Sequence, residues 1–279
     1  MINSVRRAST NHRNAKFAPP KNSNLLPDPA MDKQAVTTFD NQLIELDSVD
    51  STNNYAMGQL HAGLASGGQV YFAHQQWAGK GQRGKTWISE RGKNISMSLV
   101  LDSRALPLSG QFLLSAAVSL GCLKTAQQYE PEGWSVKWPN DLYWRDRKAA
   151  GILIENIIKG NEWLFAVIGV GMNLNQDSFP PALPNAVSLK QITRKTFDPL
   201  IAARGLAASI AAEIEVLRKH PESILPAFNA SLYKRGEKVR LKQGNHQFNT
   251  RIESVNAEGL LETEGGGRFR VGEVEFVDG

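Results

Sequence analysis

A glycine-rich, basic segment lies between two stretches that have the pattern of β-strands, and it limits what this chain can fold into. The segment runs from Gln76 to Trp87 and contains Gly79, Gly81 and Gly84. It fits the G-x-x-x-x-G-K-[ST] pattern of phosphate loops and the G-x-G-x-x-G pattern of dinucleotide-binding folds. Either pattern indicates such a site only where it follows a strand and opens a helix, because the helix N-terminus forms much of the anion site.

The flanking residues meet only the first half of this requirement. Residues 70–73 form a short apolar run that is typical of a strand. After Thr86 there is no helical apolar period, and residues 95–101 alternate between apolar and polar side chains, as in a second strand. We therefore expect a long loop between two strands. Such a loop can bind phosphate through its backbone N–H groups and through Lys80, Arg83 and Lys85.

The composition excludes several classes of protein. The chain has 279 residues, of which 41% are hydrophobic and 21% charged, enough for one large soluble domain and a small one. The single cysteine, Cys122, excludes an internal disulfide or a cysteine zinc site, and the five histidines have no metal-ligand spacing. No apolar run approaches the ~20 residues of a membrane span, and no signal peptide is present. We expect a cytoplasmic protein that does not associate with membranes.

The first 38 residues differ in composition from the rest. They are rich in Asn, Ser, Pro and Arg and have no apolar period, so we expect a disordered tail over residues 1–38. Residues 1–40 also carry +3 of the net charge of +5. The basic character of the chain therefore says little about nucleic-acid binding by its folded part. The sequence is compatible with a translation start at Met1 or at Met31.

The remaining chain has the pattern of an α+β protein with a mixed or largely antiparallel sheet and flanking helices, because tight turns join several of its strands. We expect the main domain to span residues 39–230. Beyond it, short apolar runs alternate with glycine turns and predict a small C-terminal β-barrel over residues 231–279. The strands are expected at 42–46, 70–73, 95–101, 134–138, 142–144, 151–155 and 163–170, and the helices at 51–65, 109–129 and 200–220.

Three further clusters contain residue types that occur in binding sites. The run 137–141 reads Lys-Trp-Pro-Asn-Asp, Lys148 directly precedes an apolar strand, and the run 169–173 reads Gly-Val-Gly-Met-Asn. Glycines allow a ligand to approach the backbone closely, and asparagine can both donate and accept hydrogen bonds. Taken singly, each cluster has an ordinary explanation: Lys148 is a solvated strand end, and the Pro139 segment is a turn.

Taken together, in this order and spacing, these clusters resemble the biotin–protein ligase family. The resemblance covers residues 42–175 and implies a fold related to class II aminoacyl-tRNA synthetases, followed by an SH3-like barrel. It implies two half-reactions: biotin and ATP form biotinyl-5′-adenylate, and a lysine of a biotin carboxyl carrier domain then takes the biotin. Mg²⁺ is expected to arrive with ATP and not to occupy a metal site of the protein alone. The matching segments are 50–53 (Asp-Ser-Thr-Asn), 76–87, 137–141, 148–155 and 169–173.

The resemblance also implies roles for individual residues. Joining a carboxylate to a triphosphate needs cations at the developing charge, so Lys148 and Arg83 are the expected catalytic residues. The adenylate must also be shielded from water, which we expect of Trp87. The expected biotin contacts are Ser51, Thr52, Asn53, Gln76, Gly79, Lys80, Gly81, Gln82, Lys148 and Gly151. The expected adenylate or ATP contacts are Lys80, Arg83, Lys85, Trp87, Asn140, Asp141 and Asn173.

The chain departs from the family pattern at two positions. Members commonly carry Gly-Arg-Gly-Arg where this chain has Gly79-Lys80-Gly81-Gln82, and lysine does not replace the bidentate binding of arginine. The 1–38 segment is too short and too polar for the N-terminal DNA-binding domain of some members, so we expect no specific DNA partner. Three alternatives remain: a lipoate–protein ligase of the same fold, a P-loop NTPase or kinase, and a non-catalytic nucleotide-binding module.

Overall fold

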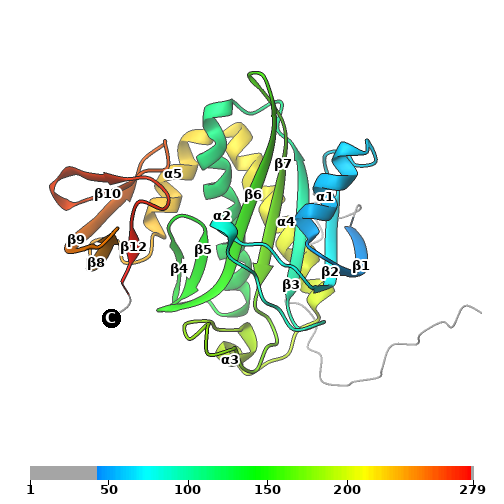
Figure 1. Cartoon of the computed structure of the whole chain (residues 1–279), viewed down its shortest axis with the longest axis horizontal. Coiled ribbons are helices and arrows are strands. Elements are labelled where there is room, and N and C mark those ends of the chain that lie inside the picture. Colours follow the sequence, from blue (N-terminus) through cyan, green and yellow to red (C-terminus); the bar gives the residue numbers. More distant parts are fainter. Residues whose placement is uncertain (1–42, 278–279) are drawn as a thin grey trace, which may run out of the picture.

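Two β-sheets form the framework of the protein. The structure is a computed structural model that describes residues 43–277 (Figure 1). The larger sheet has seven strands in the order β1-β2-β3-β7-β6-β5-β4, and the smaller has five in the order β11-β10-β9-β8-β12. The elements that build the larger sheet and its cover are β1 (Leu43–Val49), α1 (Thr52–His61), β2 (Val70–Gln76), β3 (Ile95–Asp102), α2 (Gln111–Tyr129), β4 (Trp134–Lys137), β5 (Asp141–Trp144), β6 (Arg147–Lys159), β7 (Glu162–Met172), α3 (Leu189–Thr193), α4 (Pro199–Lys219) and α5 (Pro221–Ala230).

The larger sheet is mixed, as expected. β1 and β2 are parallel, and α1 connects them. The pairings β2–β3, β3–β7, β7–β6, β6–β5 and β5–β4 are all antiparallel. Residues 77–94, here called the glycine-rich loop, join β2 to β3 with only a short 3₁₀ turn at Gln82–Gly84. No helix follows Thr86 in this part of the described chain, which removes the structural basis for a P-loop or a Rossmann dinucleotide site.

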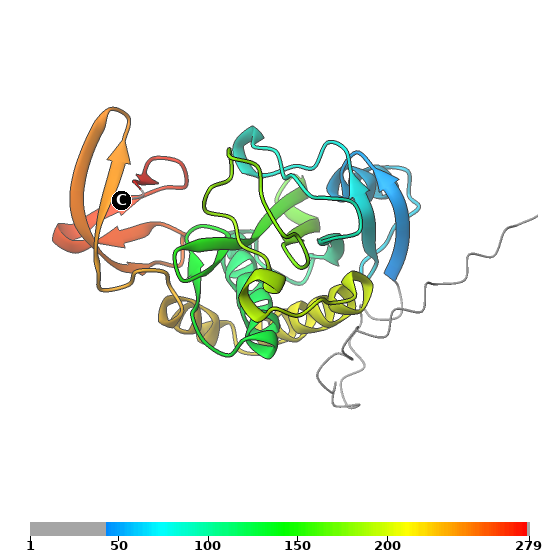
Figure 2. The ribbon, with the colours of Figure 1, turned by 90° about the horizontal axis from the view of Figure 1, so that it is seen from below.

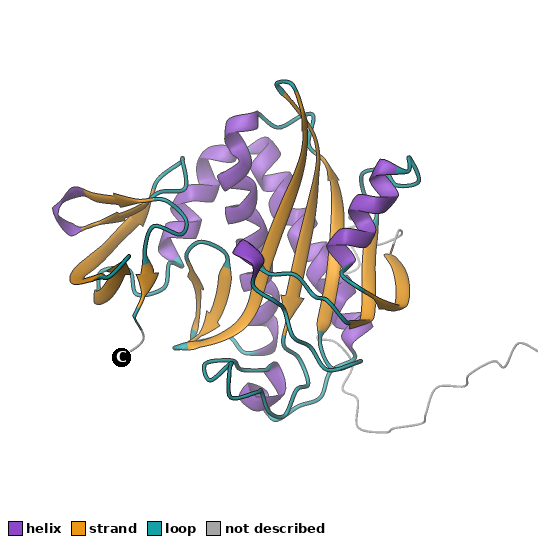
Figure 3. Ribbon diagram, viewed as in Figure 1, coloured by secondary structure: helices purple, strands orange, loops and turns teal. Residues whose placement is uncertain are grey.

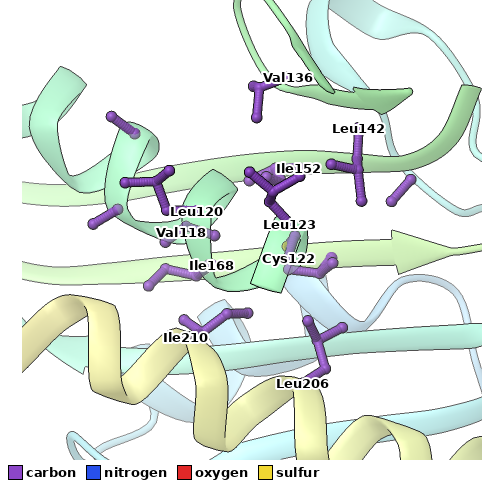
Figure 4. Packing of buried hydrophobic residues seen from close by; sticks show 14 of the residues in the cluster. Val118, Leu120, Cys122, Leu123, Val136, Leu142, Ile152, Ile168, Leu206 and Ile210 are labelled. Carbon is purple, nitrogen blue, oxygen red and sulfur yellow. The ribbon is translucent and has the colours of Figure 1, made fainter. Parts of the chain in front are cut away.

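One face of the larger sheet carries the main hydrophobic core. Helices α2 and α4 pack side by side and cover this face (Figures 2 and 3). Alternate strand residues such as Ile152 and Ile168 point into it, together with Cys122 and Ile210 from the helices (Figure 4). Burial raises the pKa of the Cys122 thiol to about 12, which fits the predicted core position. Gly121 lets the two helices approach, because a Cβ there would lie 2.7 Å from the Ile210 backbone.

The opposite face carries α1 and the glycine-rich loop, which passes in front of β6 and β7 (Figure 1, cyan). Here β6 and β7 present glycines in register: Gly151 pairs with Gly171, and Gly169 pairs with Ser98 of β3 and Leu153 of β6. Because successive side chains on a strand point to opposite faces, these glycines leave a stretch of this face without side chains. The sheet can therefore bear a ligand site on one face and a packed core on the other.

The smaller sheet is the C-terminal one and is antiparallel throughout. It confirms the prediction of short strands and glycine turns in this region, while the SH3-like barrel and the domain boundaries stay predictions. The Trp138 indole N–H donates to the Gly259 carbonyl at 3.0 Å and connects the two sheets. The strands are β8 (Lys238–Gln243), β9 (His246–Val255), β10 (Leu261–Thr263), β11 (Gly267–Phe269) and β12 (Glu275–Phe276).

Several expected boundaries were wrong. The helix predicted to reach residue 65 ends at His61, because Gly63 has a φ of 69° that a right-handed helix cannot continue through. The strand predicted at 151–155 extends over all of β6, thirteen residues. Helix α5 was missed, since Pro221 and Pro226 disguise its pattern: Pro221 begins the helix and Pro226 lies inside it. The predicted tail, residues 1–38, lies outside the described residues.

Candidate functional site

A small pocket lies where α1, the glycine-rich loop and the glycines of β6 and β7 meet. Its lining includes most of the residues expected from the sequence, brought together from six segments of the chain. Gly169 and Gly171 also line it, although the sequence analysis had noted them only as part of a cluster. The expected residues in the lining are Ser51, Thr52, Asn53, Gln76, Lys80, Gly81, Gln82, Trp87, Asn140, Asp141, Lys148 and Gly151. The expected residues Gly79, Arg83, Lys85 and Asn173 are not part of it.

The glycines of β6 and β7 provide the space for the pocket residues. A Cβ at Gly169 would overlap the side-chain amide of Asn53, and a Cβ at Gly171 would overlap the indole of Trp87. A Cβ at Gly151 would lie 3.3 Å from the same indole. These contacts give a physical reason for glycine at each position: the strands must accept side chains from α1 and from the loop directly on their backbone.

One end of the pocket is a hydrogen-bonded polar cluster. Ser98 Oγ lies 2.7 Å from Thr52 Oγ1 and 2.6 Å from Asn53 Oδ1. The amide oxygen of Asn53 cannot donate, so the single hydroxyl proton of Ser98 is donated to Asn53 Oδ1. The Thr52 proton then points to Ser98 Oγ or to Gln76 Oε1, which is 3.2 Å away. In both cases Thr52 Oγ1 can only accept a hydrogen bond from a ligand.

Gln76 complements Thr52 at the same end. Its Oε1 accepts the Thr52 backbone N–H at 2.8 Å, which fixes the orientation of the amide. Its Nε2 has no hydrogen bond within the described residues and remains a donor for a ligand. An acceptor and a donor therefore stand side by side, and they match a ligand edge that carries an N–H next to a C=O.

The other part of the pocket is charged. Lys148 Nζ lies 2.7 Å from Asp141 Oδ1, with 34% and 22% of the two side chains exposed. The ammonium also lies 5.9 Å from the centre of the Trp87 ring, in a cation–π arrangement. Sequence reasoning had left Lys148 as either a solvated strand end or a site residue, and the structure gives it a partly buried position in the pocket lining.

The Trp87 indole forms part of the pocket wall and lies on the backbone of Gly171. Its Nε1 is buried and has no hydrogen-bond partner, a single case among the side chains of residues 43–277. The pocket leaves an open volume of about 60 Å³ beside the indole, which has room for a few water molecules. A large ligand can enter only if the indole or the loop moves.

The three cations that were expected to bind phosphate make different contacts. Lys80 Nζ donates to Glu155 Oε1 at 2.7 Å and to Asn54 Oδ1 at 3.0 Å. Arg83 donates to the carbonyl of Gly272 in the C-terminal sheet region at 3.4 Å. Lys85 is exposed. The structure thus brings Lys80 to the pocket but leaves Arg83 and Lys85 outside it.

Two expected nucleotide contacts support the site through the backbone. Asn140 Nδ2 donates to the Ile152 carbonyl at 2.5 Å. Asn173 Nδ2 donates to the Val187 carbonyl at 3.2 Å. These bonds connect the strands of the site to the neighbouring loops, while Asn140 also lines the pocket.

Ser98 and Glu155 also belong to the site, although neither was among the residues expected from the sequence. Both lie on the pocket face, Ser98 on β3 and Glu155 on β6. Glu155 Oε2 accepts from Asn53 Nδ2 at 2.8 Å, so this carboxylate contacts both α1 and the loop. No sequence signal separates these two residues from the other polar residues of the same strands.

Comparison with known proteins shows what this part of the chain is similar to. Residues 45–173 match the Biotin/lipoate A/B protein ligase family. The chain is 35% identical over 126 residues to the bifunctional ligase/repressor BirA of Escherichia coli, a match that spans 45% of this chain but only 38% of that relative. It is 29% identical over 226 residues to the biotin–[acetyl-CoA-carboxylase] ligase of Paracoccus denitrificans, spanning 76% of this chain and 90% of the relative.

Solved structures share the fold. The biotin protein ligase of Aquifex aeolicus in complex with biotin and ATP superimposes with a TM-score of 0.71 at 24% identity, covering 85% of this chain and 99% of that one. This likeness extends beyond the family match and includes the C-terminal part of the chain.

Proposed function

We propose that this protein is a biotin–protein ligase, since residues 45–173 match the Biotin/lipoate A/B protein ligase family. In the first half-reaction a carboxylate oxygen of biotin attacks the α-phosphorus of ATP, and pyrophosphate leaves. In the second, the amine of an acceptor lysine attacks the acyl carbon of the adenylate, AMP leaves, and the amine loses a proton. The proposed acceptor is a biotin carboxyl carrier domain.

The observation that carries this proposal is the acceptor–donor pair at the polar end of the pocket. Thr52 Oγ1 accepts and Gln76 Nε2 donates, and the ureido ring of biotin has an N–H beside its C=O. A buried polar group that lacks its partner costs about 1–3 kcal/mol. The pocket therefore favours a ligand with this edge over one of similar size without it.

Lys148 supplies the charge that the first half-reaction needs. Its ammonium, beside Asp141, can approach the biotin carboxylate and the α-phosphate together, which lowers their repulsion as the new bond forms. Mg²⁺ is proposed to enter bound to ATP and to neutralise the departing pyrophosphate. No group of three or more His, Cys, Asp or Glu side chains within residues 43–277 is arranged to hold a metal ion.

The glycine-rich loop is proposed to shield the adenylate. Trp87 lies in the pocket lining, and closure of the loop over a ligand would keep water from the mixed anhydride. Arg83 and Lys85 contribute to phosphate binding only if the loop moves from the described position. A cytoplasmic location remains a proposal; no helix of the described chain is long and apolar enough to cross a membrane.

A lipoate–protein ligase is the main alternative, because one family contains both kinds of enzyme. Lipoate carries a disulfide ring with no N–H or C=O to meet Thr52 and Gln76. The polar end of the pocket therefore favours biotin.

The test is incubation of the full chain with radiolabelled biotin, ATP labelled at the α-phosphate and Mg²⁺, followed by chromatography. We expect biotinyl-adenylate and pyrophosphate, and AMP after a carboxyl carrier domain is added. Release of ADP and inorganic phosphate would contradict the proposal. Faster adenylate formation with lipoate than with biotin would support the alternative.

A further inference from the structure

A chain of hydrogen bonds runs from the pocket to Glu155, which does not line the pocket. Glu155 Oε2 accepts from Asn53 Nδ2 at 2.8 Å, and Asn53 Oδ1 lies 2.6 Å from Ser98 Oγ. Ser98 Oγ lies 2.7 Å from Thr52 Oγ1, the group that faces the ligand. Asn53, Ser98 and Thr52 are each buried, so water does not compete for these bonds.

The direction of this chain is set at its far end. A carboxylate only accepts hydrogen bonds, so Asn53 must turn its NH₂ group towards Glu155 and its oxygen towards Ser98. The Ser98 proton is then used on Asn53, and Thr52 is left as an acceptor. A second bond from Asn53 Nδ2 to the Leu153 carbonyl, at 3.3 Å, favours the same orientation of the amide.

We propose that Glu155 is a positioning and specificity residue: its carboxylate fixes the polarity of the Asn53–Ser98–Thr52 chain and so requires an N–H donor on the ligand. This inference rests on the proposed function, which identifies that donor as a ureido N–H of biotin. The second carboxylate oxygen accepts from Lys80 Nζ at 2.7 Å, so Glu155 also connects the polar end of the pocket to the glycine-rich loop. The two roles can be separated by experiment.

The measurement is a discrimination ratio, which is the dissociation constant of an analogue divided by that of biotin. Both constants are obtained by titration calorimetry. The probes are biotin and the two cyclic carbamate analogues in which one ureido N–H is replaced by a ring oxygen. For the wild-type chain we expect one analogue to bind roughly 10- to 100-fold more weakly than biotin, because its ring oxygen would meet the acceptor-only Thr52. The ratio for that analogue is then measured in the variants.

Glu155→Gln is isosteric and can present either an acceptor or a donor to Asn53. The chain can then reverse if Asn53 gives up its 3.3 Å bond to the Leu153 carbonyl; Thr52 can then donate, and we expect the ratio to fall below that of the wild type. Lys80→Met breaks the ion pair but keeps the carboxylate, so its ratio should remain that of the wild type even if biotin itself binds more weakly. Glu162→Gln, at the start of β7 and exposed, is the control for loss of an acidic residue.

The exchange variant Lys80→Glu/Glu155→Lys separates polarity from the ion pair. It keeps opposite charges at the two positions, but an ammonium at position 155 can only donate and forces the chain to reverse. We expect the ratio to stay low in this protein. Recovery of the wild-type ratio would overturn the inference and leave Glu155 only its contact with the loop. Glu155→Gln decides alone if the exchange variant does not fold.

Failure of the inference and failure of the proposed function have different signatures. An unchanged ratio in Glu155→Gln, or a wild-type chain that binds both analogues as tightly as biotin, overturns only the inference if adenylate still forms. A wild-type chain that binds no biotin overturns the proposed function and the inference together.

Discussion

At the scale of single residues, the pocket depends on glycines as much as on polar groups. Gly169 and Gly171 let Asn53 and Trp87 lie directly on the backbone of β7. The selectivity of the polar end then depends on the direction of its hydrogen bonds. Thr52 can only accept from a ligand, because the Ser98 proton is donated to Asn53. Small residues make the space, and an acceptor at the far end of a short chain determines which ligand can use it.

Lys148 is the first residue whose removal we expect to change the rate. Lys148→Ala should lower the rate of biotinyl-adenylate formation on the order of 10²–10³-fold, because its charge stabilises the transition state more than the bound substrates. Lys159→Ala, at the exposed end of the same strand, is the matched control. Single-turnover kinetics measure the effect. A variant with near-wild-type rates would mean that Lys148 has no role in the reaction.

Gln82 is expected to limit how tightly the adenylate is held. It lines the pocket as a neutral residue, where a hydrogen bond from a charged donor would contribute roughly 1.5–3 kcal/mol. Gln82→Arg should therefore release biotinyl-adenylate about 10-fold more slowly than the wild type. Thr86→Arg adds the same charge to an exposed position of the loop and serves as the control. Equal release rates in the wild type and Gln82→Arg would mean that position 82 does not contact the adenylate.

At the scale of elements, the glycine-rich loop has to move when a ligand enters, yet it is held by contacts with other parts of the chain. The loop must move to admit a large ligand, because the Trp87 indole fills the space above Gly171 and the pocket leaves about 60 Å³ open. It makes contacts on two sides: Lys80 pairs with Glu155, and Arg83 reaches Gly272 beside the C-terminal sheet. Closure of the pocket is therefore coupled to β6 on one side and to the C-terminal part of the chain on the other.

Gly171→Ala tests the contact between the loop residue Trp87 and the backbone of β7. The added Cβ would overlap the Trp87 indole and force it off the pocket. We expect faster association of biotin, faster release of adenylate and faster tryptic cleavage after Arg83 and Lys85. Stopped-flow fluorescence and limited proteolysis measure these rates. If association, release and cleavage all match the wild type, the indole does not control access.

At the scale of the whole molecule, the contact between the two sheets has a specific structural basis. Trp138 donates to the Gly259 carbonyl, and Gly259 has a φ of 82° directly against Phe112 of α2. The contact places the C-terminal sheet beside the segment that leads from β4 into the pocket. The small sheet can therefore influence the site without lining it.

Gly259→Ala is expected to destabilise this contact. The new Cβ would lie 2.8 Å from the Phe112 ring at a backbone angle that alanine rarely adopts. Strain and overpacking together should lower the free energy of unfolding by about 2–4 kcal/mol. Gly244→Ala has a comparable φ of 58° but no neighbour within 4 Å, so it should lose only the strain part, about 1 kcal/mol. Urea unfolding followed by tryptophan fluorescence measures both, and equal losses would contradict the role of Phe112.

The amino-acid sequence by itself determined most of the elements and many of the residues of the site. The alternation over residues 95–101 predicted β3, and the absence of a helical period after Thr86 predicted the loop. Both are local patterns, and local patterns decide secondary structure where the apolar period is clear. Most of the expected residues also line one pocket, because their order along the chain matches that of a known family.

Only the tertiary structure decided how these residues act on one another. Asn53 and Glu155 are 102 positions apart in the chain, yet their contact fixes the direction of the hydrogen bonds at Thr52. The Lys80–Glu155 pair and the contact of Arg83 with Gly272 likewise join distant segments. The physical reason is that a donor or acceptor role is a property of a pair of groups, and the pairs are formed only when the sheet brings its strands together.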